Sequence, residues 1–232
     1  MNEIKRQIVV FGDFSSITFN AQVELGNILN KFGLKMSVTQ DILAGVPVQT
    51  VNNMIPNIEM RPVFMTEDKN FSLFIGTKRI HIEQIGEGAM SFDDFLARGK
   101  EIVSTILDVY KVNFNRLALN GRLSSYDKIF VDSLYGKIFN PSVLYGDSSE
   151  EFSFRINNVD CNQELNSNIN KIISLNRTKE ILPDNNLTSV VIIDYDFNTV
   201  YDFSKTFTYE NLEFFLNEAC EFRKVILNYE KS

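Results

Sequence analysis

The feature that most constrains the fold is a succession of elements that the sequence contains twice. In each half, a strand-like run leads into a helical pattern, three further strand-like runs follow, and an amphipathic helix closes the series. The short sequences GDFSS at 12–16 and GRLSS at 121–125 fall near the ends of the two leading strands. The pattern predicts an α+β fold of two similar halves, 1–112 and 113–232, that form antiparallel sheet covered by helices.

Two alternatives to this duplication stay open. Glycine often forms the turn between a strand and a helix, and serine often caps the helix that follows. The similarity of GDFSS and GRLSS therefore has a local explanation that needs no duplication. The two halves are also compatible with one continuous pseudo-symmetric domain. Because one half alone would expose a face of its sheet, the repeated order favours duplication.

Helix caps and apolar periodicity define the two closing helices. Ser91 precedes the helical run up to 112 and has Asp94 three residues later, a pair that resembles a capping box. Thr208 takes the same place before the last helical run, and a further helix is expected over 124–139. The predicted core comprises the large apolar residues on the expected inner faces: Val10, Leu25, Ile28, Leu29, Phe95, Ile102, Ile106, Leu212, Phe215 and Leu216.

Length and composition limit the class of protein. The chain of 232 residues is long enough for one large domain or two small ones, and each would bury a core. No apolar run approaches the ~18–20 residues of a membrane span, and no signal peptide is recognised at the start. Two cysteines are too few for a disulfide framework or a thiolate zinc site. We therefore expect a cytoplasmic location.

The net charge of −7 is concentrated in the last third of the chain. Residues 1–145 carry 15 acidic and 15 basic side chains, whereas 146–232 carry 15 acidic and 8 basic ones. This balance argues against direct nucleic-acid binding, which needs clustered Lys and Arg. In the last helical run Glu210, Glu213 and Glu221 share a face, which is either solvated or a docking surface for another, basic protein.

Asp194 and Asp196 are the strongest enzymatic candidates. Two carboxylates two residues apart on a strand point to the same face and could share a divalent cation, as in a metal-dependent hydrolase or nuclease. The competing interpretation is simple alternation, in which Val191, Ile193 and Tyr195 face the core and the acids face water.

The remaining reactive side chains carry less information. The single histidine, His81, has no evident partners for catalysis or metal binding. Cys161 is expected in a turn, and Cys220 beside the apolar face of a helix. Arg116 and Arg122 share one face of a strand, where they could bind an anion or pair with surface carboxylates. We therefore predict no catalytic residue and no cofactor.

Four segments carry a resemblance to a known family: MRPVFMTEDKNFSLFIGTKRIHI, SFDDFLARGKEI, FNRLALNGRL and VVIIDYDFNTV. Together they resemble a bacterial family of sporadically distributed proteins of unknown function. Asn120 stands where that family's pattern has an Arg. The resemblance implies a fold and no activity. By analogy with other sporadic bacterial proteins, we expect a non-catalytic binding or adaptor subunit of a multi-protein system, such as phage defence or a toxin–antitoxin module. The sequence leaves the oligomeric state open.

Overall fold

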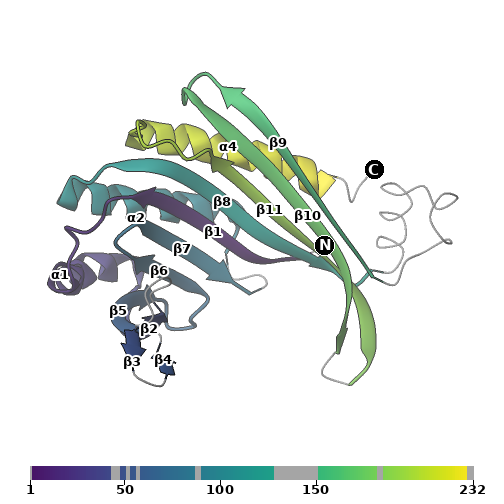
Figure 1. Cartoon of the computed structure of the whole chain (residues 1–232), viewed down its shortest axis with the longest axis horizontal. Coiled ribbons are helices and arrows are strands. Elements are labelled where there is room, and N and C mark those ends of the chain that lie inside the picture. Colours follow the sequence, from purple (N-terminus) through teal and green to yellow (C-terminus); the bar gives the residue numbers. More distant parts are fainter. Residues whose placement is uncertain are drawn as a thin grey trace, which may run out of the picture.

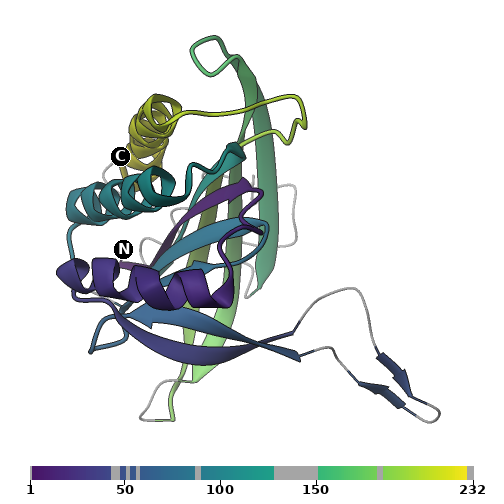
Figure 2. The same cartoon turned by 90° about the vertical axis from the view of Figure 1, so that its left-hand side faces the viewer.

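The fold is α+β and is built on one large antiparallel sheet. The computed structural model describes residues 2–42, 48–50, 53–55, 58–86, 90–127, 151–181 and 185–228. Within these ranges, helices α1, α2 and α4 lie on one face of the sheet (Figure 2). The helices are α1 (Phe19–Leu29), the short 3-10 helix η1 (Asn30–Phe32), α2 (Phe92–Tyr110) and α4 (Tyr209–Asn228). The strands are β1 (Asn2–Gly12), β2 (Lys35–Ile42), β3 (Val48–Thr50), β4 (Asn53–Ile55), β5 (Ile58–Met65), β6 (Phe71–Ile75), β7 (Arg79–Ile85), β8 (Phe114–Ser125), β9 (Phe152–Asn162), β10 (Ser167–Ile181) and β11 (Leu187–Thr199).

Nine strands form a single sheet in the order β2-β5-β6-β7-β1-β8-β11-β10-β9, and β3 pairs with β4 in a separate hairpin (Figure 1). Every neighbouring pair in the large sheet is antiparallel. The first half of the chain meets the second where β1 pairs with β8, in a register that places Lys5 opposite Arg122 and Val9 opposite Ala118. The two halves therefore share one sheet.

The core lies between the sheet and the three helices. One cluster of buried side chains contains residues of all three helices and of both halves of the sheet. All the predicted core residues are buried except Ile28, whose side chain is 38% exposed. Leu25 and Leu29 stand four residues apart and face the core, whereas Ile28 lies about 60° from Leu25 and about 100° from Leu29 around the helix. The expectation for Ile28 was therefore wrong.

Both predicted caps of the closing helices are confirmed. The Ser91 hydroxyl accepts a hydrogen bond from the Asp94 backbone N–H at 3.0 Å and donates one to its carboxylate at 2.7 Å. At α4, the Asn211 N–H donates to the Thr208 hydroxyl at 3.4 Å, and the Asn211 side chain accepts from the Thr208 N–H at 2.9 Å. Each pair satisfies donors that the first helical turn leaves free.

The GDFSS and GRLSS segments differ in structure. β1 ends at Gly12, so GDFSS forms the turn that precedes α1, and the cap of α1 is Thr18. GRLSS instead lies wholly within β8, which continues to Ser125. The helix expected over 124–139 is therefore wrong at its four described residues, since 124–125 belong to β8 and 126–127 are not helical, and from 128 onward it lies outside the described residues.

A buried ionic cluster joins the two halves on the helix side of the sheet. The Glu3 carboxylate accepts hydrogen bonds from Arg223 at 2.6 and 3.1 Å and from the Tyr195 hydroxyl at 2.5 Å. Arg6 lies 3.7 Å from the same carboxylate and donates to the backbone carbonyl of Met90 at 3.0 Å. β1 of the first half is thereby tied to β11 and α4 of the second.

Candidate functional site

The two aspartates of the metal hypothesis lie on the face of the sheet opposite the described helices α1, α2 and α4, where each has a neighbouring partner. Both Asp194 oxygens accept hydrogen bonds from the Arg122 guanidinium, at 2.6 and 3.0 Å. Asp196 lies opposite Asn120, whose side-chain nitrogen donates to Asp196 Oδ1 at 2.6 Å when the amide is oriented toward it. Burial raises the pKa of the half-buried Asp196. The alternation along β11 is confirmed for Ile193 and Tyr195, which are buried in the core. Asn198, on the same face as the two aspartates, is also buried and does not face water as the alternation predicts.

No group of three or more His, Cys, Asp or Glu side chains that could hold a metal ion occurs among the residues the structure describes. A cation between Asp194 and Asp196 would have to displace the bidentate Arg122. The geometry therefore favours a structural role for Asp194, since an Arg–carboxylate fork links β8 to β11.

Other polar side chains on this face pair with sheet neighbours. Arg116 donates to the buried Asn198 side chain at 3.2 Å and stacks on Phe11, with its guanidinium carbon 4.9 Å from the ring centroid. His81 is partly buried beside Glu83, with 3.7 Å between Nε2 and the carboxylate, and burial lowers the pKa of His81. The imidazole is therefore neutral at neutral pH.

The acidic residues of α4 are exposed, and two of them contact lysines. Glu213 lies 3.2 Å from Lys100 of α2, and Glu221 lies 2.7 Å from Lys224 on its own helix. Glu210 stands in the first turn of α4, where the Thr208 hydroxyl lowers the pKa of its carboxyl. A docking role for this face stays a prediction, with two of its three charges partly neutralised by neighbours.

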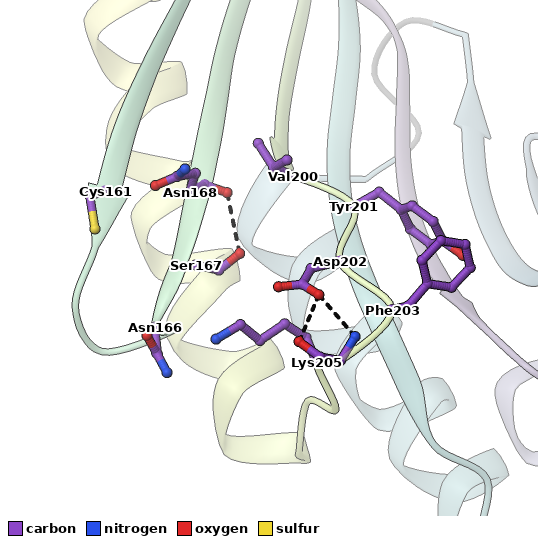
Figure 3. A pocket seen from close by; sticks show the side chains of 10 residues that line it. Cys161, Asn166, Ser167, Asn168, Val200, Tyr201, Asp202, Phe203 and Lys205 are labelled. Carbon is purple, nitrogen blue, oxygen red and sulfur yellow. Dashed lines mark hydrogen bonds between the residues drawn. The ribbon is translucent and has the colours of Figure 1, made fainter.

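The segment Val200–Phe207 follows β11 and leads to α4, and we call it the rim loop. Both of its ends are fixed to the sheet, because the Val200 N–H donates to the Asn168 carbonyl at 2.7 Å and the Phe207 N–H donates to the Phe114 carbonyl at 2.7 Å. Between them, Asp202 Oδ1 accepts hydrogen bonds from the N–H and the hydroxyl of Ser204, at 2.9 and 2.7 Å (Figure 3). These bonds lower the pKa of Asp202.

The rim loop displays two aromatic side chains. Tyr201 is 48% exposed and Phe203 is 85% exposed, and their rings meet edge to face with centroids 4.5 Å apart. Figure 3 shows both rings on one side of the loop, with Asp202 and Lys205 on the other. We call Tyr201 and Phe203 the aromatic ridge.

A pocket lies on each side of the aromatic ridge. The hairpin pocket, of about 580 Å³, is an open depression between the rim loop and the end of the β9–β10 hairpin, and Cys161, Asn166 and Lys205 contribute to its wall (Figure 3). The cation pocket, of about 500 Å³, is lined by residues near the ends of β1 and β8 together with the ridge: Phe11, Gly12, Asp13, Lys78, Asn115, Arg116, Tyr201 and Phe203. Both volumes fall in the range of ligand sites in proteins.

Cys161 is exposed and Cys220 is partly buried, and both are free thiols. Cys161 is the last residue but one of β9 and not part of a turn as expected. Cys220 lies beside the core on α4, as expected, and burial raises the pKa of its thiol. A raised pKa leaves the thiol protonated at neutral pH, which opposes reactivity.

The rim loop is not among the sites that the sequence predicts. The available signal was the alternation of aromatic residues with turn-forming Asp and Ser in YDFS (201–204), directly after an apolar strand.

Comparison with known proteins gives no relative: no protein-family model, no curated protein and no solved structure matches the chain significantly. The resemblance to the sporadically distributed bacterial family thus stays a prediction. In the described part of the chain, no helix combines the length and the apolar character that crossing a membrane requires.

Proposed function

We propose that this chain is a non-catalytic binding protein that holds another protein at the aromatic ridge. The observation that carries the proposal is the 85% exposure of Phe203 on a loop whose two ends are hydrogen-bonded to the sheet. A large apolar ring left in water forgoes the free energy that burial would give it, about 25 cal/mol per Å². A partner that covers the ring recovers this free energy.

The surroundings of the ridge suit a protein contact. Aromatic residues are enriched at the centres of protein interfaces, where surrounding contacts exclude water. The Asp202–Ser204 turn and the anchored ends Val200 and Phe207 hold the ridge before a partner arrives. Such pre-organisation lowers the entropy cost of association.

The alternative of a metal-dependent hydrolase is weaker, because Arg122 occupies both oxygens of Asp194. The adaptor role, in which the acidic face of α4 attracts a basic protein, is compatible with a contact at the ridge. α4 begins directly after the rim loop, so Glu210 would stand at the edge of the same surface.

Site-specific photo-crosslinking tests the proposal. A photoreactive phenylalanine analogue is placed at Phe203 in the native host, and adducts are identified by mass spectrometry. The matched control carries the analogue at Val225, another exposed apolar residue, on α4. We expect a defined protein adduct from position 203 that is absent from position 225.

With that partner purified, Phe203→Ala should weaken binding by about 30-fold, the effect of a hot-spot residue, without changing the melting temperature. No adduct at 203, the same adducts at both positions, or unchanged affinity in Phe203→Ala would refute the proposal.

We also propose that the two halves arose by duplication. What supports this is the order of eight strands, β5-β6-β7-β1 followed by β8-β11-β10-β9, in which the second set repeats the first in reverse about the β1–β8 pair. A pseudo-two-fold axis between β1 and β8 would produce that order, and α2 and α4 would be equivalent helices. Superposition of β1, β5, β6, β7 and α2 on β8, β9, β10, β11 and α4 tests it, and differing strand directions or faces would refute it.

A further inference from the structure

We propose that the cation pocket binds a carboxylate that stands next to an apolar or aromatic group. This inference rests on the proposed function, because it names the feature of the partner that the ridge and its neighbouring pocket would recognise together. The pocket lies on the Phe11 side of the aromatic ridge.

Two cations, Arg116 and Lys78, line this pocket together with one carboxylate, Asp13, and Arg116 also lies near enough to Asp196 to oppose the rise that burial causes in the pKa of that carboxyl. Arg116 and Lys78 form no ion pair with another described residue, although Lys78 is close enough to Asp13 to lower the pKa of that carboxyl after the stronger effect of Ser15. The one hydrogen-bond partner of Arg116 is the neutral side chain of Asn198, and its buried Nε has none within the described chain.

The Arg116 guanidinium is held ready for an anion. Its stacking on the Phe11 ring and its bond to Asn198 fix the plane of the fork. A planar guanidinium matches the two oxygens of a carboxylate, and the pair forms charge-assisted bonds that are about twice as strong as neutral ones. The carboxylate of Asp13, which also lines the pocket, accepts a hydrogen bond from the Ser15 N–H at 3.2 Å and so has a partner within its own turn.

Aromatic side chains form a further part of the pocket wall. Phe203 and Tyr201 line the cation pocket as well as forming the ridge. A ligand whose carboxylate reaches Arg116 would therefore lay its adjoining group against these rings. The carboxylate could belong to a chain terminus or to an Asp or Glu side chain, and the two sources share this chemistry.

Nuclear magnetic resonance titration of the ¹⁵N-labelled full chain tests the inference with small probes. The first probe is 3-phenylpropionate, and its matched control is the uncharged 3-phenylpropionamide. We expect the carboxylate to shift the amide resonances of Gly12, Asn115 and Phe203 in a saturable way, and the amide to bind at least tenfold more weakly. N-acetyl-phenylalanine and acetyl-aspartyl-phenylalanine amide then distinguish a terminal from a side-chain carboxylate.

Variants assign the effect to the two cations. Arg116→Gln and Lys78→Ala should each weaken 3-phenylpropionate binding, Arg116→Gln by about tenfold or more. Lys205→Ala removes a lysine from the opposite side of the rim loop and should leave binding unchanged. Because Lys78 is exposed, its variant remains informative if Arg116→Gln fails to fold.

The inference is overturned if 3-phenylpropionate shifts none of these resonances, or if the amide binds as well as the acid. If either result is obtained while a protein adduct forms at Phe203, the proposed function stands and only the inference of a carboxylate ligand is refuted. Conversely, carboxylate binding without a protein adduct would support this site and refute the proposed function.

Discussion

The sharpest stability prediction concerns Glu3, which is the single acid of the buried cluster that joins the two halves. Its side chain is 7% exposed and contacts Arg223, Arg6 and Tyr195. Glu3→Ala removes the acceptor for all three groups at once. Two guanidinium groups would then remain together under the helices, with side chains only 8% and 14% exposed and no carboxylate between them.

The expected cost follows from this burial. Removing one partner of a buried ion pair costs about 3–5 kcal/mol, because the remaining charge is desolvated without compensation. For a chain of this length, each kcal/mol lowers the melting temperature by about 2–4 °C, so we expect a fall of roughly 6–20 °C. Burial and, to a smaller extent, repulsion from Arg223 already lower the pKa of Arg6 in the intact cluster, and the loss of Glu3 would remove the attraction that opposes both effects.

Urea unfolding and thermal melts measure the change. Glu67→Ala is the matched control, because its ion pair with Lys35 is almost fully exposed and its loss should leave the melting temperature unchanged. In a double-mutant cycle, Arg223→Met should recover part of the loss caused by Glu3→Ala. If Glu3→Ala unfolds within about 1 kcal/mol of the native chain, the cluster does not hold the halves together as argued.

Three further outcomes follow from the same structure. Gly121→Ala should destabilise the fold by several kcal/mol in urea unfolding, since a Cβ there would lie 2.2 Å from the Tyr195 ring; an unchanged midpoint would contradict this packing. Because burial raises the pKa of Asp196, the folded state binds the proton of this carboxyl more tightly than the unfolded chain does. The protonated carboxyl therefore contributes stability below about pH 4, and this contribution is lost as pH rises through the folded pKa. Asp196→Asn should therefore melt higher at pH 7, with a difference that shrinks toward pH 4; a lower melting temperature at pH 7 would refute it. Reversal of Glu213 and Glu221 to Lys should slow association with a basic partner at low salt in stopped-flow measurements, and an on-rate independent of salt would exclude docking at that face.

Local patterns predicted much of the fold. Strand alternation placed Ile193 and Tyr195 in the core and the acids between them on the other face, as observed. Capping chemistry located the starts of α2 and α4. These features depend on neighbours within a few residues of each other, so the sequence carries them directly.

Features that depend on strand order were beyond the sequence. Arg122 faces Asp194 only because β8 lies beside β11, and no local pattern encodes that neighbour. A proline within a strand-like run, as Pro62 is in NIEMRPVFM, indicates an edge strand or a bulge, yet β5 lies between β2 and β6. Its position is tolerated because the β5–β6 pairing starts at Val63, so only β2 faces Pro62.

The candidate site was missed for a related reason. The sequence around Tyr201 and Phe203 does not show that these side chains are exposed, and their exposure is what makes them candidates for binding. The cation pocket adds Phe11 and Arg116, which come from strands that meet only in the folded sheet. Charge counted over the whole chain could not reveal these two local cations.

The pairing of β1 with β8 has a consequence for synthesis in the cell. β1 is central in the finished sheet, but its partner on one side is more than a hundred residues later in the chain. At ribosomal rates of about 5–20 residues per second, β1 waits on the order of ten seconds with one edge unpaired. Such an edge is a template for pairing with other chains. Translation that stalls before β8 would thus release a first half in which β1, a central strand of the finished sheet, is an exposed edge.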